Sequence, residues 1–427
     1  EMGAYLSAPI TEKETEEGEL HGGEVSFGVS AMQGWRRGME DAHIGIDLEP
    51  PRSDGFPAVT MFGVWDGHGG KEVARYVKRH MCLEVTKLQE YQEGAFGAAL
   101  VKAFHKMDEL LWDQANLPEL NALKKDGDDD GEEDESESEA EGSGAVAASS
   151  APLQAGPRRR AASESSDVSG SVGAKGQGPE DEEDGAAQVL QLFKTLLASK
   201  KQMKAASAGG GGDGGGGGGG GVVVGGGSKP TVCNLPSVHV TAGCTSVVAL
   251  LIGAKQLVVA NAGDSRAVLC RSGEAVALSE DHKPSQKREL DRIERVGGFV
   301  NGVGRVNGNL NLSRSLGDLK YKQASHAPPS EQMITAEPDV TSFDIDPVTD
   351  EFMILACDGI WDCFSNEAAV RFVRLRMLEG MSPVDIAKDA CDVCLAEDPK
   401  TTQGIGGDNM TCLIVKFKAP SSAGSPF

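Results

Sequence analysis

The chain of 427 residues is poor in aromatic side chains, in basic charge and in long apolar runs. Aromatic residues make up 5% and hydrophobic residues 39% of the chain, so part of it is expected to lie outside a packed core. Lys and Arg number 41 against 65 Asp and Glu, for a net charge of −24. Because nucleic-acid binders are usually basic, this balance argues against direct binding of nucleic acid. No apolar run approaches the ~20 residues of a membrane-spanning helix.

Two motifs of phosphate chemistry are also missing. No cysteine is followed six residues later by arginine, which excludes a Cys-x5-Arg phosphatase, and no Gly-Lys-Ser/Thr exists, which excludes a P-loop. The nine cysteines are scattered. Cys391 and Cys394 form a CxxC pair, but no second pair accompanies it, which argues against a metal or redox role. Scattered thiols fit a reducing compartment, so we expect an intracellular protein.

The predicted folded domain is discontinuous. Its two parts are residues 25–122 and 231–418, and residues 123–230 form a low-complexity insert between them. Residues 1–24 are expected to be an N-terminal segment and residues 419–427 a disordered tail.

The insert is acidic at its start and rich in glycine near its end. Residues 126–141 are mostly Asp and Glu, and residues 209–221 are glycine except for Asp213. Such stretches cannot bury enough apolar surface to offset the entropy of ordering them. Residues 186–204 differ because their apolar side chains recur at helical spacing. This island predicts a helix, either docked on the domain or binding a partner.

Strand patterns cluster in the middle of the predicted domain, with helical patterns on either side. Turn signals between four successive strands predict an antiparallel meander, and the clustering favours a layered α+β fold. The strand candidates are Val59–Trp65, Thr245–Ile252, Gln256–Ala262, Arg266–Cys270 and Ala275–Leu278. The helix candidates are Gly70–Leu88, Ala95–Trp112, Pro284–Val296, Asn366–Leu378 and Pro383–Ala396.

Three aspartates lie where apolar, strand-like runs begin or end. Asp66 and Asp358 each follow such a run and precede a glycine, and Asp408 comes just before another run. A lone Asp-Gly pair is usually only a turn. Here the strands would place all three carboxylates at a sheet edge, where they can converge.

Converging carboxylates would require a cation. Two carboxylates ~4 Å apart repel by roughly 4 kcal/mol at an effective dielectric of 20. Oxygen ligands without nearby Cys or His favour Mg²⁺ or Mn²⁺ over Zn²⁺. Two such ions sharing Asp66 would lower the pKa of a water held between them, which suits in-line attack on a phosphate ester. The glycine at position 67 would let its backbone carbonyl approach a metal.

Further candidate residues lie around Asp66 and upstream of it. Arg36 and Arg37 precede Glu40 and Asp41, and the arginine fork suits a phosphate dianion. Neighbouring side chains of an extended backbone point to opposite faces, so only one arginine is expected to reach the site. His68 lies two residues after Asp66 and is either a general acid for the leaving alcohol or a structural histidine.

At these residues the chain resembles the metal-dependent protein phosphatase 2C family of Ser/Thr phosphatases. Within the family it is most similar to the gamma type, on the basis of residues 2–7, the acidic insert and Gln256–Asp264. The matching stretches follow the family's order and are Ser30–His43, Val64–Gly70, Ala260–Arg266, Glu280–Pro284, Leu312–Asp318, Ala356–Trp361 and Gly407–Thr411.

The resemblance implies a four-layer αββα sandwich of the α+β class, with two central antiparallel sheets flanked by helices. It also implies hydrolysis of phosphoserine and phosphothreonine in phosphorylated protein substrates by a metal-bridged water. The flap that influences substrate choice in the family would fall at Leu319–Met333.

The resemblance further implies the role of each site residue. Two Mg²⁺ or Mn²⁺ ions would be bound, with a weak third held by Asp264 together with Asp358. Arg36 would bind the phosphate, Asp41 would orient the water and His68 would be the general acid. The ligands of the two main ions would be Asp66, the Gly67 carbonyl, Asp358 and Asp408, with Glu40 acting directly or through water.

Two features outside the predicted domain suggest partners. The run Met2-Gly3-Ala4-Tyr5-Leu6-Ser7 fits the N-myristoylation pattern, so Gly3 is a candidate lipid anchor. Location then stays open between cytoplasm, nucleus and membrane. The acidic run 126–141 raises a different class of function, an interaction protein whose insert binds basic partners, alone or alongside catalysis. We expect a monomer.

Overall fold

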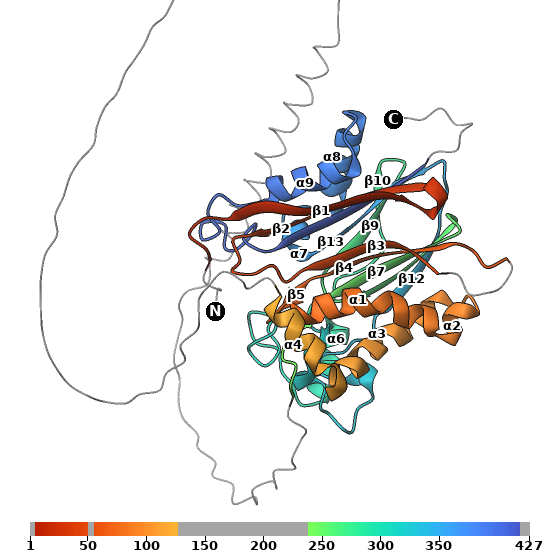
Figure 1. The fold of residues 1–427 in the computed structure, drawn as a ribbon. Helices are drawn as coiled ribbons and strands as arrows, with labels where there is room; N and C mark the ends of the chain where they lie inside the picture. Colours follow the sequence, from red (N-terminus) through yellow and green to blue (C-terminus); the bar gives the residue numbers. More distant parts are fainter. Residues whose placement is uncertain (1–4, 50–54, 127–237, 419–427) are drawn as a thin grey trace, which may run out of the picture. The chain divides into compact units, whose positions relative to one another are not determined.

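Two antiparallel β-sheets pack face to face, and helices cover the outer side of each sheet (Figure 1). The computed structural model describes residues 5–49, 55–126 and 238–418. The arrangement confirms the predicted α+β fold with four layers.

The first sheet has six strands. In spatial order these are β1 (Ile10–Leu20), β2 (Val25–Gly34), β14 (Met410–Phe417), β13 (Asp350–Ala356), β9 (Arg266–Arg271) and β10 (Glu274–Ala277). Every neighbouring pair is antiparallel.

The second sheet has five strands, again all antiparallel. In spatial order these are β12 (Asp339–Asp344), β8 (Gln256–Ala262), β7 (Ser246–Ile252), β4 (Val59–Trp65) and β3 (Ala42–Leu48). A small third sheet joins β11 (Leu316–Gly317), β6 (Gly243–Cys244) and β5 (Gly67–His68).

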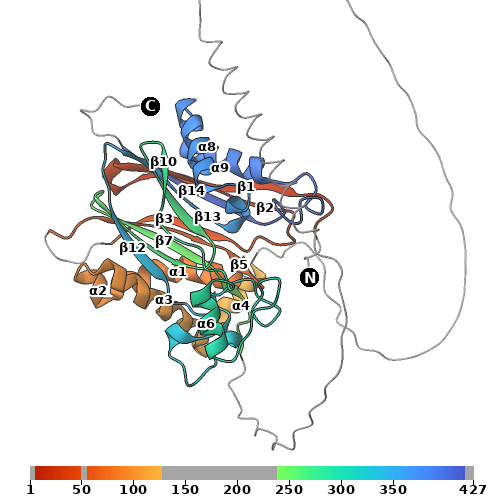
Figure 2. The same ribbon diagram turned by 180° about the vertical axis from the view of Figure 1, so that it is seen from behind.

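The helices form two outer layers, which Figure 2 shows from the opposite side. On the five-stranded sheet lie α1 (Glu72–Lys87), α2 (Gln89–Gln92), α3 (Phe96–Trp112) and α4 (Leu117–Lys125). On the six-stranded sheet lie α7 (Asp358–Trp361), α8 (Asn366–Leu378) and α9 (Pro383–Cys394). Helix α6 (Lys287–Arg295) packs against the segment that leads to β12, and short 3-10 helices occur at His21–Gly23, Gln114–Asn116, Leu319–Tyr321 and Pro329–Glu331.

Local sequence explains where two of these helices begin. The hydroxyl of Ser365 accepts a hydrogen bond from the backbone N–H of Ala368, and that of Ser382 accepts one from Asp385. Each serine thereby satisfies an N–H that has no partner within the helix. Pro383 follows as the first residue of α9, where its missing N–H costs nothing.

The core between the two sheets is built from alternating strand positions. Phe62 and Val64 of β4 face Leu355 of β13 and Leu413 of β14 in one apolar cluster. Residues at the alternate positions of β4, such as Met61 and Trp65, belong instead to the cluster beneath α1 and α3. All seven residues of β4 are buried, because each face of the strand is covered.

The predicted meander is wrong. Strands β7 and β8 form a hairpin in the five-stranded sheet, but β9 and β10 form theirs in the six-stranded sheet. The chain crosses between the sheets at Gly263–Ser265, where Gly263 has a φ of 121°. Apolar alternation and a Gly-Asp pair predict a turn equally well for a hairpin and for a crossover.

Strand β1 lies ahead of residue 25, the predicted start of the domain. It is an edge strand, paired along its length with β2, and most of its residues are polar and exposed. Polar sequence on an exposed edge does not give the apolar alternation that identifies a strand.

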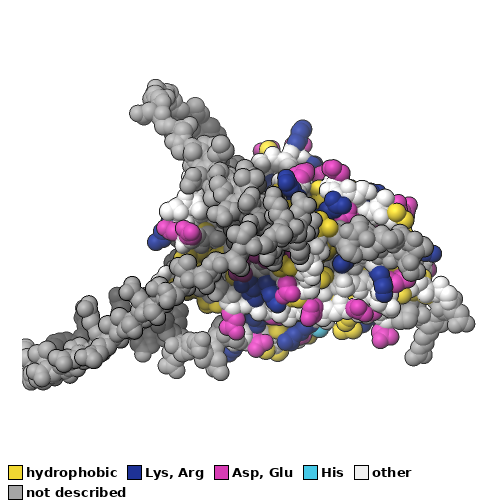
Figure 3. Space-filling view, turned by 90° about the horizontal axis from the view of Figure 1, so that it is seen from above, with side chains coloured by type: hydrophobic (Ala, Val, Ile, Leu, Met, Phe, Trp, Pro, Cys, Tyr) yellow, Lys and Arg dark blue, Asp and Glu magenta, His cyan; other side chains and the backbone are white. Residues whose placement is uncertain are grey.

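Several predictions fall on residues that the structure does not describe. These are the lipidation site Gly3, the acidic run from residue 127 onward, the helix at 186–204 and the tail 419–427. Among the described residues, no helix is long and apolar enough to cross a membrane. On the face shown in Figure 3, basic and acidic side chains of the described residues lie interspersed.

Candidate metal centre

One pocket gathers carboxylates from four distant parts of the chain. Asp66 follows β4, Asp264 lies in the crossover after β8, Asp358 follows β13 and Asp408 precedes β14. Both large sheets therefore contribute a strand end to the same place. The pocket is lined by Arg36, Asp66, Gly67, His68, Thr245, Asp264, Asn311, Leu312, Asp358 and Asp408.

Asp41 lies directly beside Asp66. One donor atom from each of Asp41, Asp66 and Cys357 falls within 4.8 Å of the other two. The Oδ2 of Asp41 accepts a hydrogen bond of 2.6 Å from the hydroxyl of Thr411. Its Oδ1 is buried, and no described residue bonds to it.

Burial and mutual repulsion hold these carboxylates toward their neutral forms. Burial, with Asp408 and Glu40 nearby, raises the pKa of Asp41 to about 7. Burial raises the pKa of Asp66 well above its usual value, and Asp41 and Asp358 add to the shift. The pKa of Asp358 is likewise raised by burial and by neighbouring aspartates. The cluster is thus costly to ionise by itself.

Two basic side chains reach the cluster, but each pairs with only one carboxylate. The Arg36 Nη2 lies 2.5 Å from the Oδ2 of Asp408, and Lys283 pairs with Asp264. Within the described segments, no basic side chain forms an ion pair with Asp66 or Asp358. Further positive charge is what these two carboxylates need in order to ionise together.

The donors fit a hard divalent cation. Burial and the surrounding carboxylates raise the pKa of the Cys357 thiol well above its usual value, so it stays protonated and is no thiolate ligand. The remaining donors are carboxylate and carbonyl oxygens. Oxygen donors of this kind suit Mg²⁺ or Mn²⁺ better than Zn²⁺.

Position 67 accepts only a glycine. A Cβ added there would lie 2.2 Å from the carbonyl oxygen of Glu40. Glu40 is therefore held close to the pocket through its backbone, and its N–H donates to the Oδ1 of Asn409 at 3.0 Å. Burial raises the pKa of the Glu40 carboxyl. Glu40 does not itself line the pocket, which is compatible with a contact through water.

His68 forms a hydrogen bond with Asp318, a residue for which the sequence predicted no role. Its Nε2 lies 2.6 Å from the Oδ2 of Asp318, whose side chain is almost fully buried. Burial alone would lower the pKa of His68, but Asp318 raises it above the usual value. His68 thus favours the protonated form that a general acid needs.

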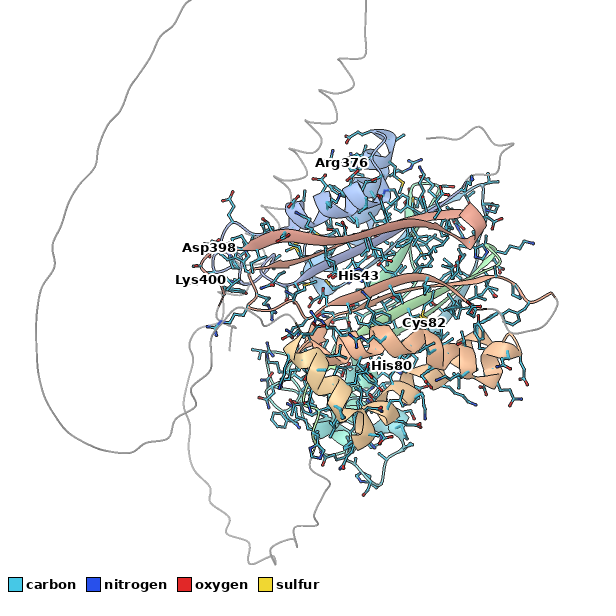
Figure 4. All side chains as sticks on the ribbon, in the orientation of Figure 1. His43, His80, Cys82, Arg376, Asp398 and Lys400 are labelled. Atoms are coloured by element: carbon cyan, nitrogen blue, oxygen red, sulfur yellow. The ribbon has the colours of Figure 1, made fainter. Side chains whose placement is uncertain are left out.

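Other histidines have structural surroundings. His43 lies on β3 (Figure 4). It is buried, and burial with Lys78 nearby lowers its pKa to about 3, so its ring is neutral. His80 on α1 packs its ring against Tyr76, and its Nε2 lies 3.0 Å from Glu119. Neither lines the pocket.

All the predicted site residues except Glu40 and Asp41 line the pocket itself, and those two lie next to it. The structure adds Lys283, Asp318 and Thr411 as contacts of Asp264, His68 and Asp41. Each occurs in a stretch that carries the family resemblance, which was the available signal. Their partners could not be read from the chain because they are far apart in sequence.

Comparison with protein families agrees with the resemblance. The chain matches the family model "Protein phosphatase 2C" over residues 25–148 and 231–402. It is 35% identical over 422 residues to "Probable protein phosphatase 2C 11" of Oryza sativa subsp. japonica, covering 98% of this chain and 92% of the relative. It is also 35% identical to "Probable protein phosphatase 2C 3" of Paramecium tetraurelia, covering 98% of this chain and 100% of the relative.

Solved structures share the fold. A phosphatase from a pathogenic strain of Toxoplasma gondii aligns with a TM-score of 0.55 at 19% identity, covering 95% of this chain and 96% of that one. A C. elegans sex determining protein aligns with a TM-score of 0.52 at 19% identity, covering 94% of this chain and 66% of that one.

Proposed function

Since the chain belongs to the protein phosphatase 2C family, and is a metal-dependent protein serine/threonine phosphatase, we propose that its acidic pocket is a catalytic centre for two cations. The observation that carries this proposal is the convergence of buried carboxylates with raised pKa values, of which Asp66 and Asp358 have no basic partner among the described residues.

The residues divide by what they hold. Asp66, the Gly67 carbonyl, Asp358 and Asp408 would bind two Mg²⁺ or Mn²⁺ ions, with Glu40 acting directly or through water. Asp264, with Asp358, would hold a weaker third ion. Bound cations of this kind neutralise phosphate charge and lower the pKa of water enough to supply a nucleophile at neutral pH.

The remaining side chains act on the substrate and on water. Arg36 is half exposed at the pocket, and its guanidinium can bind two oxygens of a phosphoserine or phosphothreonine. Asp41 can accept a hydrogen bond from the attacking water at its Oδ1 and so orient it. His68 gives a proton to the departing alcohol oxygen.

Metal-dependent hydrolysis of a phosphoserine peptide tests this proposal. We expect activity with Mn²⁺ or Mg²⁺, loss in excess chelator, and a fall of at least ~10³-fold in kcat for Asp66→Asn, because the ions would lose a shared ligand. Asp350→Asn is the matched control. It removes a buried carboxylate that pairs with Arg271 and lies at the start of β13, whereas Asp358 of the pocket follows the end of that strand. Full activity in chelator, or in Asp66→Asn, would refute the assignment.

We also propose that the insert recruits basic proteins to the catalytic domain, as its acidic run 126–141 suggests. Removing residues 127–230 leaves α4 intact. We expect the shortened protein to hydrolyse a small phosphopeptide normally and to bind basic proteins more weakly. Unchanged binding to such a protein at low salt would remove this role.

The gamma-type assignment, the monomeric state and the location stay proposals. A myristoylated Gly3 would bring the protein to membranes only weakly, because one acyl chain gives marginal, reversible binding. Mass spectrometry of the native N-terminal peptide tests this point, and an unmodified glycine would reject it.

A further inference from the structure

Asp318 is placed to control His68 without reaching the pocket itself. It is 2% exposed, and its Oδ2 lies 2.6 Å from the Nε2 of His68. The same oxygen accepts a hydrogen bond of 2.6 Å from the hydroxyl of Ser315. An ionised carboxylate only accepts hydrogen bonds, so this contact requires His68 to carry a proton on Nε2.

The backbone around Asp318 is held in an uncommon conformation. Its φ is 50°, in the left-handed region, and its N–H donates to the carbonyl of Ala242 at 3.0 Å. Gly243 packs against the contact: a Cβ there would lie 2.5 Å from the Oδ2 of Asp318 and 2.8 Å from the Nε2 of His68. A strained residue with a side chain of one fixed orientation often marks a functional position.

A second, buried ion pair braces this segment from behind. Lys322 pairs with Asp108 of α3 at 2.5 Å and also donates to the carbonyl of Ser315 at 2.8 Å. The other oxygen of Asp108 accepts a hydrogen bond of 2.9 Å from the N–H of Gly317. The strand end that carries Asp318 is therefore tied to α3 on one side and to β6 on the other.

We propose that Asp318 is a positioning residue for the reaction, fixing the ring of His68 so that its Nδ1 faces the leaving group. The inference rests on the proposed phosphatase centre and extends it to a residue that does not touch the substrate. Asp318 keeps the Nε2 proton engaged, and only the Nδ1 proton is then free to be delivered.

The proton balance of the step is simple. Water adds to phosphorus, the bond from phosphorus to the serine oxygen breaks, and the serine oxygen takes the Nδ1 proton of His68. The attacking water loses a proton, and His68 regains one from solvent, so the net products are serine and inorganic phosphate. Asp318 accepts the Nε2–H bond throughout and exchanges no proton.

The choice of leaving group isolates this role. The alkoxide of serine is a poor leaving group that needs protonation, whereas p-nitrophenolate leaves without it. We expect Asp318→Asn to lower kcat for a phosphoserine peptide on the order of 10- to 100-fold. For p-nitrophenyl phosphate we expect a fall of less than about threefold. Asparagine is suited to this site because it tolerates the left-handed conformation.

The protein used is the full chain with Mn²⁺, and its melting temperature confirms that each variant is folded. In a His68→Gln background, Asp318→Asn should change the ratio of the two rates no further, because both residues act through one proton. Asp350→Asn should leave the ratio at its wild-type value. Ser315→Ala should shift it in the same direction as Asp318→Asn, by about threefold, because Asp318 loses one of two contacts.

Equal losses on both substrates would overturn the inference, because a general structural or metal defect does not select a leaving group. Additive effects of His68→Gln and Asp318→Asn would also overturn it. If Asp318→Asn does not fold, Ser315→Ala decides, and an unchanged ratio then rejects the role. A wild-type protein inactive on both substrates would instead end the proposed function; an active one with an unaltered ratio in Asp318→Asn ends only this inference.

Discussion

Two groups of buried carboxylates in this protein differ in whether basic side chains balance their charge. Near α6, Glu289 is 1% exposed, and its carboxylate lies 2.6 Å from Arg314 and 2.6 Å from Arg292. In the pocket at the sheet ends, Asp66 and Asp358 are surrounded by further carboxylates and form no ion pair with the described basic residues.

The ionisation of the two groups differs accordingly. Burial alone would raise the pKa of Glu289, but Arg314 and Arg292 lower it to about 2. Burial and like charges raise the pKa of Asp66 and Asp358 well above the usual value. The first group is complete within the protein, whereas the second requires positive charge from outside. In these two groups the direction of the pKa shift follows the charge of the neighbouring side chains, and the raised values belong to the candidate cation ligands.

The largest change in stability is expected from removing the Glu289 carboxylate, whose charge the protein itself balances. Glu289→Gln leaves the buried Arg292 without its carboxylate and leaves the buried Arg314 with Asp339 alone, so we expect a loss of about 3–5 kcal/mol in the free energy of unfolding. Urea unfolding measures it. Glu379→Gln is the control, because its pair with Arg376 lies at the end of α8 and is more exposed. A loss in Glu289→Gln no larger than in the control would remove the contrast.

A bound cation should balance the charge of the carboxylates around Asp66 and Asp358 and so stabilise the fold. Burial raises the pKa of Asp41 to about 7, so the folded protein without metal holds protons that the unfolded chain releases. Its stability is therefore expected to fall as pH rises from about 4 through 7. Cations compete with these protons, and at a hundredfold excess over Kd they stabilise by about 2.7 kcal/mol.

We accordingly expect Mn²⁺ to raise the melting temperature more at pH 7.5 than at pH 5.5. Thermal unfolding with and without chelator at both pH values gives the comparison. Equal shifts at the two pH values would mean that protons and cations do not share the site.

The smallest effect is expected from removing one of the clustered charges. In the metal-free protein, Asp358→Asn relieves repulsion within the cluster, so we expect it to stabilise the fold by about 1 kcal/mol while abolishing metal-dependent activity. This sign is opposite to that for Glu289→Gln. A marked destabilisation without metal would show that Asp358 is a structural residue as well.

Local sequence was sufficient for the strands that present the ligands. The apolar run Val59–Trp65 and the helix Asn366–Leu378 have the predicted bounds, because apolar periodicity reflects burial directly. The sequence could not show which sheet a strand joins, as β9 demonstrates, nor that polar β1 is a strand. The partner of His68 was equally out of reach, because Asp318 meets it only after β6 and β11 pair.

The crossover at Gly263–Ser265 and the strand ends around it have a mechanical consequence. Asp66 comes from the five-stranded sheet, whereas Asp358 and Asp408 come from the six-stranded sheet. Ions shared among them would link the two layers along one edge of the sandwich, in addition to the apolar core and the hydrogen bond from Thr411 to Asp41. We expect these ions to make the catalytic edge the last part of the sandwich to open during unfolding. Removing the ions with a chelator should make the same edge the first part to open.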